Sequence, residues 1–268
     1  TSSLVGSEMC IRDRDRIFRQ SYGSRIAANA KLIRHGNLSL EYGEDFQFYD
    51  SCDMSASAQQ IETLYLQETA RYGVDNVALL TPYRQKTETG VNALNERLRE
   101  KLNPQDGKKP EVAYRKRIYR LGDKVMQIKN CEDISNGDIG YITSVTRDDT
   151  DSVLTVDFGD GRIAEYDGSD LEMLDLAYAS TIHKSQGSEY KSVIINLQCA
   201  HAVMLVRPLV YTAITRAKER VLIVGERRAL CIAIKRTDTE QRGTMLSARI
   251  KELISNVKGD HYNGNLAQ

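Results

Sequence analysis

The sequence predicts an α/β fold in which a parallel sheet flanked by helices is interrupted by a small antiparallel β-barrel. Three observations support this prediction. Helical segments alternate with short apolar segments from Ile17 to Asn103. Short β-type segments separated by glycine-containing turns follow, and the alternation of helix and strand then resumes. A short β-rich block between two alternating parts indicates an insertion into a larger domain.

The first helix is expected over Ile17–Gly36, where apolar residues recur at helical spacing and the final glycine suits a helix end. The alternating residues Phe46–Tyr49 predict a short strand. A second helix is expected over Ser57–Tyr72, with a capping box formed by Ser57 and Gln60 and a stop at Gly73.

The run Val77–Leu80 is continuously apolar, which is typical of a buried parallel strand. Leucines at helical spacing after Val91 predict an amphipathic helix that ends at Asn103-Pro104. The β-type segments of the middle block are divided by the turn sequences Asn136-Gly137-Asp138 and Gly159-Asp160-Gly161. These segments are Lys124–Ile128, Gly140–Val145, Val153–Phe158 and Arg162–Tyr166.

The last part of the chain is expected to alternate again. A polar, glycine- and asparagine-rich tail from Lys258 is expected to be disordered. The helices are expected near Ala177–Gln186, Pro208–Glu219, Arg227–Lys235 and Thr244–Ile254, and the strands at Val193–Ile195 and Val221–Val224.

Charge is balanced over the chain but uneven along it. The 268 residues contain 37 Lys and Arg and 37 Asp and Glu, which excludes a uniformly basic coat. The segment Lys108–Arg120 nevertheless holds six basic residues and one acid, whereas Asp148–Asp175 holds ten acids and only Arg162. The basic strip is suited to holding phosphates. The alternative is a solvated loop or helix face.

The five cysteines are scattered and form no C-x-x-C pair, which favours a reducing, cytoplasmic compartment and speaks against a disulfide framework or a zinc cluster. No apolar run approaches the roughly 20 residues of a membrane span. Residues 1–14 resemble a translated sequencing adapter and lack the apolar core of a signal peptide, so we expect no fold there.

Two motifs point to a function. Thr181-Ile182-His183-Lys184-Ser185-Gln186-Gly187-Ser188-Glu189-Tyr190 and Tyr211-Thr212-Ala213-Ile214-Thr215-Arg216-Ala217-Lys218 together resemble helicase motifs V and VI of the RecD-like branch of superfamily 1. The resemblance extends from about Phe18 to Ile254. It implies the C-terminal half of an ATP-driven motor that moves 5′ to 3′ on single-stranded DNA, with a RecA-like sheet and an SH3-like barrel.

Arg216 is the residue with the sharpest expected role. A guanidinium fixed beside the γ-phosphoryl group stabilises the charge that grows there during hydrolysis. The resemblance makes Arg216 such an arginine finger, with Thr212 beside the nucleotide. Spacing alone favours the alternative, a surface arginine that caps a helix end.

The resemblance assigns two tasks to the motif V segment. Thr181, His183 and Lys184 would face the single strand, and the nucleotide would be bound by Gln186, Gly187 and Glu189, with the carboxylate near the ribose. Hydroxyls, amides and backbone N–H groups at such a turn can hold phosphate and sugar oxygens. For His183 alone, a structural histidine is the alternative.

Further contacts are implied in the rest of the chain. Phe18-Arg19-Gln20 resembles motif IV, which would make Arg19 a second γ-phosphate sensor and Gln20 an ATP contact. Thr81 and Tyr83 follow a strand at a ligand-binding loop, so DNA contact is expected there. In the barrel, Lys124 and Asn130 are candidate DNA contacts.

The motor implied by this resemblance needs parts that the sequence does not contain. Gly107-Lys108 lacks both the following Ser or Thr and the earlier glycine of a phosphate loop, and no acidic pair follows an apolar strand to hold Mg²⁺. We therefore expect ATP and Mg²⁺ to bind between this part and a missing N-terminal RecA-like domain, with no metal ligands here and no ATP hydrolysis by this part alone.

The domain organisation expected from these segments has five parts, and two alternative functions remain open. The alternatives are the helicase part of a conjugative relaxase and a non-catalytic nucleic-acid-binding module. The expected parts are an adapter-like stretch at 1–14, a first RecA-like part at 15–117, an SH3-like barrel at 118–171, a second RecA-like part at 172–256 and a tail at 257–268.

Overall fold

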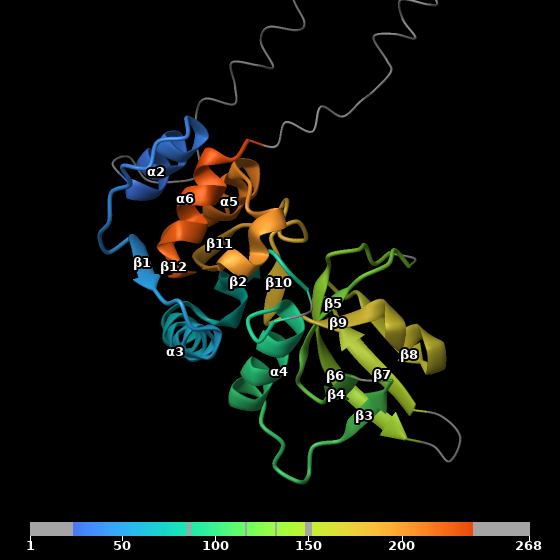
Figure 1. Ribbon diagram of the computed structural model, residues 1–268. Coiled ribbons are helices and arrows are strands. Elements are labelled where there is room, and N and C mark those ends of the chain that lie inside the picture. Colours follow the sequence, from blue (N-terminus) through green and yellow to red (C-terminus); the bar gives the residue numbers. More distant parts are fainter. Residues whose placement is uncertain (1–23, 85–86, 116, 132, 148–151, 238–268) are drawn as a thin grey trace, which may run out of the picture. The chain divides into compact units, whose positions relative to one another are not determined.

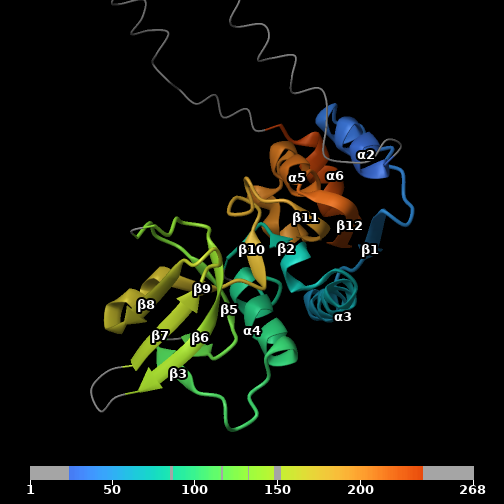
Figure 2. The ribbon, with the colours of Figure 1, turned by 180° about the vertical axis from the view of Figure 1, so that it is seen from behind.

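A computed structural model describes residues 24–237 except 85–86, 116, 132 and 148–151. The expected α/β class is confirmed by a five-stranded, all-parallel sheet in the order β1-β12-β11-β2-β10. Its strands are β1 (Phe46–Asp50), β2 (Val77–Thr81), β10 (Ala179–Thr181), β11 (Tyr190–Leu197) and β12 (Ala217–Gly225). Figures 1 and 2 show helices on both faces of this sheet.

Alternate residues of the central strands enter two separate cores, as a sheet buried on both faces requires. On one face, Leu80 and Ile195 pack with α2 (Arg25–Arg34), α5 (Arg207–Ile214) and α6 (Arg227–Lys235). On the other, Leu79 and Ile194 pack with α3 (Met54–Tyr72) and α4 (Val91–Leu102). The predicted apolar run Val77–Leu80 is buried throughout, which confirms it as a central strand.

The β-rich block is an antiparallel sheet in the order β8-β7-β6-β5-β9. Val112 and Tyr119, from a hairpin that the sequence did not predict, complete its core with Leu154 and Val156. The strands are β3 (Glu111–Tyr114), β4 (Arg117–Arg120), β5 (Lys124–Gln127), β6 (Ile139–Arg147), β7 (Ser152–Asp157), β8 (Ile163–Asp167) and β9 (Leu174–Leu176), with 3₁₀ turns at Val74–Asn76 (η2), Gly168–Met173 (η3) and Cys199–Met204 (η4).

The four predicted β-type segments of the barrel and the two glycine turns are confirmed. Gly137, Gly159 and Gly161 all have positive φ. The strand β9 pairs with β5 although it lies after the expected boundary at residue 171. The domain boundaries themselves stay predictions.

The helix expected near Ala177–Gln186 is wrong. Ala179–Thr181 is instead a strand in which Thr181 pairs with Thr81 of β2, and turns follow to Gly187. Parallel pairing at the sheet edge satisfies the backbone of Ala179–Thr181, so tertiary contacts override the local helical spacing.

Three expected helix limits also differ. The helix after Pro208 ends at Ile214 rather than Glu219, because the chain from Ala217 joins the sheet beside Tyr190. The second helix begins at Met54 with Asp53 as its cap, whose carboxylate accepts from Ala56 N, so the Ser57–Gln60 box is wrong. The first begins at Arg25 after the cap Ser24; residues 17–23 and 244–254 lie outside the described part.

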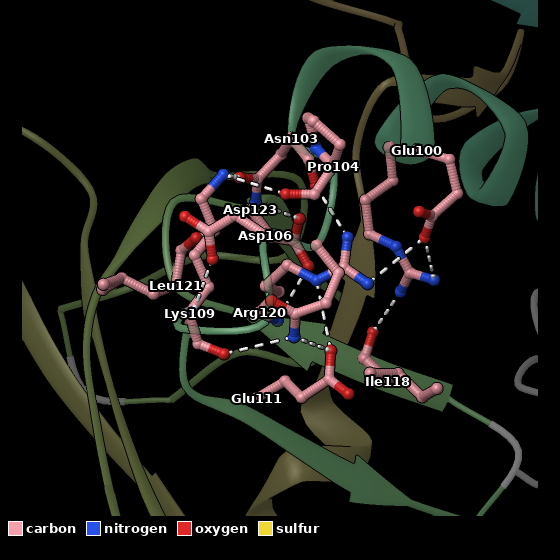
Figure 3. Close-up of polar contacts among 12 residues, drawn as sticks. Glu100, Asn103, Pro104, Asp106, Lys109, Glu111, Ile118, Arg120, Leu121 and Asp123 are labelled. Carbon is pink, nitrogen blue, oxygen red and sulfur yellow. Dashed lines mark hydrogen bonds and ion pairs between the residues drawn. The ribbon is translucent and has the colours of Figure 1, made fainter.

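A polar joint fixes the hairpin and barrel to the end of α4 (Figure 3). The Arg120 side chain is 5% exposed and pairs with Glu111 at 3.2 Å and Glu100 at 3.3 Å. It also donates to the Asn103 carbonyl, and the Asn103 amide donates to Asp123 at 2.8 Å. Part of the basic strip is therefore internal, and Arg120 holds the fold together instead of facing a ligand.

Candidate functional site

The carboxyl ends of β2 and β10 bring together the residues expected to face DNA. Thr81 and Thr181 are register partners on adjacent strands, and Lys184 lies one turn beyond, its N–H donating to the Thr181 carbonyl. His183 is exposed and Lys184 half-buried. Tyr83 is half-buried on the loop after β2, its ring 5.2 Å from that of His201. Residues from two segments about a hundred positions apart thus share one end of the sheet.

Lys184 ends in a cluster around Asp175, the residue at the middle of β9. Its ammonium lies 3.5 Å from the carboxylate, which also pairs with Arg84 and, at 2.8 Å, with Arg117. Burial lowers the pKa of Lys184, and the charges of Arg84 and Arg117 lower it further, while Asp175 acts in the opposite direction. The effect of burial on the pKa of Lys184 is therefore larger than the opposing effect of Asp175.

The amino ends of β11 and β12 bring together the residues expected to face the nucleotide. Arg216 directly precedes β12, and its carbonyl accepts from Tyr190 N at the start of β11. Its guanidinium donates to the carbonyls of Thr212 at 3.3 Å and Ser188 at 3.2 Å. Arg216 is therefore fixed between the end of α5 and the end of the motif V segment, although it lies beyond the helix itself.

The motif V segment leads from one end of the sheet to the other. Gln186 and Gly187 are exposed in its final turn, and Glu189 pairs with Lys218 at 2.9 Å. Gly187 has φ of 93°, a left-handed conformation that favours glycine. The turn leads to Ser188, whose carbonyl accepts from Arg216, whereas the backbone N–H of Lys184 donates to Thr181 at the carboxyl end.

One expected DNA contact, Thr81, is fully buried, and its hydroxyl donates to the Thr89 carbonyl at 3.1 Å. Two others lie elsewhere. Lys124 is 3% exposed, and its ammonium pairs with Asp75 and donates to the Val74 carbonyl, both at 2.9 Å. Asn130 accepts from Asn136 N at 2.7 Å and so stabilises the barrel turn. These positions give both residues a structural task. Arg19 and Gln20 lie outside the described residues.

Lys124 and Asp75 form a second joint between the barrel and the sheet domain. Burial lowers the pKa of Lys124, and only part of this is offset by its hydrogen bond to Asp75. Burial alone would raise the pKa of Asp75, but hydrogen bonds from Tyr141 and Lys124 hold it below its ordinary value.

Sequence reasoning missed Arg84, Arg117 and Asp175 as candidate site residues. Arg84 stands directly after the expected contact Tyr83, and Arg117 belongs to the basic strip, so both signals were present. Asp175 closes the acidic segment, and nothing in its local sequence distinguishes it from the other acids.

Neither a candidate metal cluster nor a membrane-spanning helix occurs in the part of the chain that the structure describes. That part contains no group of three or more His, Cys, Asp or Glu side chains placed to hold a metal ion. None of its helices has both the length and the apolar character needed to cross a bilayer.

Comparison with protein families gives two matches. Residues 94–158 match the SH3 domain of ATP-dependent RecD-like DNA helicases, and residues 176–224 match the UvrD-like helicase C-terminal domain. The first covers the hairpin and most of the barrel, and the second covers both ends of the motif V segment and Arg216.

The chain is also similar to longer proteins. It is 35% identical over 237 residues to the ATP-dependent RecD2 DNA helicase of Deinococcus radiodurans, with 88% of this chain and 31% of that protein covered. It is 26% identical to the RecBCD enzyme subunit RecD of Mycobacterium tuberculosis, with 83% and 40% covered. The chain thus spans 31% to 40% of the length of these relatives.

Among solved structures, the Pif1 helicase from Candida albicans matches with a TM-score of 0.47 and 17% identity, covering 90% of this chain and 60% of that chain. Similarity at this level carries no argument by itself. The two domain matches and the similarity to RecD2 and RecD over most of the sequence show that the chain belongs to the RecD-like helicases, as a C-terminal part of such a protein.

Proposed function

We propose that this chain is the C-terminal motor part of an ATP-dependent DNA helicase. In this proposal it binds single-stranded DNA at the carboxyl end of its parallel sheet. At the amino end it supplies Arg216 to a nucleotide whose phosphate and Mg²⁺ contacts come from another domain. Movement in the 5′-to-3′ direction is part of the proposal.

The observation that carries the proposal is the separation of the two sets of residues. Asn196 of β11 lies level with Thr81, its amide 3.3 Å from the Thr81 hydroxyl, whereas Tyr190 of the same strand lies beside Arg216. Six residues of extended strand separate these levels by about 20 Å. The two proposed binding sites therefore lie at different levels of the same strand.

The proposed chemistry at the amino end is electrostatic. Two backbone carbonyls hold the Arg216 guanidinium in place before a nucleotide arrives, so little reorganisation is needed when charge develops on the γ-phosphoryl oxygens. Bound Mg²⁺ would neutralise charge between the β- and γ-phosphates, and its ligands are proposed to belong to the other domain. Gln186 and Glu189 are proposed to orient the nucleotide, with Arg19 as a second positive group.

The test combines two measurements on the 268-residue chain. The chain is expected to bind a fluorescent oligothymidylate with an affinity that falls as NaCl rises, because phosphate contacts release counterions. It is expected to show no DNA-stimulated ATP hydrolysis, because its sequence contains no phosphate loop. Binding that does not change with salt, or hydrolysis by the purified chain, would contradict the proposal.

A further inference from the structure

Asp175 collects positive side chains from three separate segments. Arg84 comes from the loop after β2, Arg117 from the β3–β4 hairpin and Lys184 from the motif V segment. One carboxylate thus faces three cations, which leaves a net charge of two positive units within this cluster. The three cations repel one another at this distance, and a bound anion would offset that repulsion.

The cations are also more exposed than the carboxylate that joins them. The exposed fraction is 38% for Arg84, 36% for Arg117 and 28% for Lys184, against 15% for Asp175. Asp175 lies beneath them, so the positive groups face solvent. The more buried carboxylate holds the cations in place, and the exposed cations form a surface that can bind an anion. A neutral surface ion pair would not do so.

The three cations are held in place independently of any ligand. Arg117 donates to the Leu174 carbonyl at 2.6 Å in addition to its pairing with Asp175. The backbone carbonyl of Arg84 accepts from Asn92 N at the start of α4. Lys184 is fixed by the turn after Thr181. Side chains arranged in advance lose little further freedom when an anion binds.

The cluster opens onto a cavity of about 530 Å³ between α4 and the hairpin. Arg117 and Asp175 line it, together with the aromatic ring of Tyr114 and the cations Arg115 and Lys129. The acids Glu96 and Glu172 also line it, and Glu172 pairs with both Arg115 and Lys129. Arg117 and Asp175 therefore connect the cluster with this cavity.

We propose that Arg84, Arg117 and Lys184 form one phosphate-binding site for the single strand, with Asp175 as the residue that positions them. The inference rests on the proposed function and extends it, because it carries the DNA path from the carboxyl end of the sheet onto the β3–β4 hairpin. Arg117 is the new contact: it belongs to neither helicase motif, and it makes the hairpin part of the DNA-binding surface.

A backbone phosphate of DNA fits this cluster better than a phosphate of ATP. Lys184 and Arg84 adjoin Thr181 and Tyr83 at the carboxyl end of the sheet, whereas Arg216 lies at the amino end. A guanidinium binds a phosphate through paired N–H donors, and each of the three cations is more than a quarter exposed.

Arg162 provides a matched control for Arg117. Its side chain is also 36% exposed, it pairs with Asp138 at 2.6 Å, and it donates to the Phe158 carbonyl, but it lies on the barrel away from this cluster. The experiment measures the anisotropy of a fluorescent oligothymidylate bound to the full chain at several NaCl concentrations, with wild type, Arg117→Ala, Arg117→Lys, Arg84→Ala and Arg162→Ala. Thermal transitions of all five proteins are recorded.

Loss of one phosphate contact is expected to reduce the slope of log affinity against log salt by about 0.7. Between about 50 and 200 mM salt, wild type should therefore lose about 2.6-fold more affinity than Arg117→Ala. Arg84→Ala should behave like Arg117→Ala, and Arg117→Lys and Arg162→Ala should keep the wild-type slope. Arg84→Ala tests the inference with little risk of misfolding, because in the described part of the chain the Arg84 side chain bonds only to Asp175.

The inference would be overturned if Arg117→Ala and Arg84→Ala both kept the wild-type salt slope. It would also be overturned if the slope fell by the same amount in Arg162→Ala. Either result would leave the proposed function intact. A wild-type chain that binds no oligothymidylate at all would instead contradict the proposed function. A lower affinity in Arg117→Ala with an unchanged slope and a lowered thermal transition would show that Arg117 is structural, which also overturns the inference.

Discussion

The two ends of the parallel sheet hold their positive side chains in different ways. At the carboxyl end, Lys184 shares the carboxylate of Asp175 with Arg84 and Arg117. At the amino end, Arg216 donates to the backbone carbonyls of Thr212 and Ser188. A shared carboxylate gathers several cations over a wide surface, which suits a polymer of phosphates, whereas two carbonyls fix one guanidinium at a point, which suits one reacting group.

The motif V segment is the only part of either motif that reaches both ends. Lys184 donates its backbone N–H to Thr181 at the carboxyl end, and the carbonyl of Ser188 accepts from Arg216 at the amino end. Four residues thus separate the backbone contact with Thr181 from the contact with Arg216. In the proposed function the segment links the DNA-binding end of the sheet to the nucleotide-binding end, and substitutions can test the two ends separately.

The largest expected effect is that of Arg216→Ala in the full-length protein that carries this sequence. ATP hydrolysis should fall by about 10³-fold or more, as loss of an arginine finger does elsewhere. The affinity for oligothymidylate should stay within about twofold of wild type, because Arg216 precedes β12 at the amino end of the sheet and its guanidinium is bound to Thr212 and Ser188. Steady-state hydrolysis and anisotropy measure the two quantities, and equal losses in both would show that Arg216 has a structural role.

The next largest effect concerns His201, which lies under the carboxyl end against Tyr83 and is fully buried. Burial lowers the pKa of His201 to about 4, with a smaller opposite effect of Glu226. As the pH falls from about 6.5 to about 4, His201 binds a proton in the unfolded chain but stays neutral in the folded chain. Folding stability is therefore lost over that pH range.

This loss should be about 3 kcal/mol in wild type. His201→Gln should lack this loss of unfolding free energy, whatever its stability at pH 7. The two proteins share all their acidic groups, so the difference between their pH dependences comes from residue 201. Urea unfolding followed at several pH values supplies the comparison. Parallel stability curves for the two proteins would rule out a neutral buried His201.

A smaller effect is expected for Lys184→Ala, which removes one cation from the carboxyl end. The affinity for oligothymidylate should fall about tenfold, because a charge-assisted contact to phosphate is lost. Lys218→Ala is the matched control at the amino end, where Lys218 pairs with Glu189, and it should leave this affinity unchanged. Anisotropy titrations that show the same loss for both lysines would break the proposed division between the two ends.

The smallest expected effect is that of Gly187→Ala in the connecting segment. At φ of 93° an added side chain strains the backbone by about 1 kcal/mol, although no atom lies near the new carbon. Gly107→Ala, at φ of 78° in an exposed loop, imposes the same kind of strain away from both ends. Urea unfolding should show similar destabilisation in the two variants, while only Gly187→Ala should lower oligothymidylate affinity; no difference in affinity would contradict the proposed link.

Much of the fold could be predicted because its signals are local. The apolar run Val77–Leu80 and the glycine turns around Gly137 and Gly159 each specify their own conformation. The edge strand Ala179–Thr181 could not be predicted, because its backbone is stabilised by Thr81 and its neighbours, which are about a hundred residues away along the chain.

The candidate site divides in the same way. Motif spacing predicts that Lys184 and Arg216 matter, and the structure adds that they occupy opposite ends of one sheet. The cluster around Asp175 joins residues from four segments, and no spacing rule connects residues that meet only after folding. The basic strip was a correct signal of charge but gave no means of separating the internal Arg120 from the outward-facing Arg117.

Hydrogen–deuterium exchange of the 268-residue chain, with and without saturating oligothymidylate, tests the separation of the two ends most directly. DNA should slow exchange in peptides that cover 80–84, 114–118 and 174–184, and leave those covering 211–218 unchanged. The account would be contradicted if DNA slowed exchange at 211–218 but left it unchanged at 80–84 and 174–184, because DNA would then occupy the end assigned to the nucleotide.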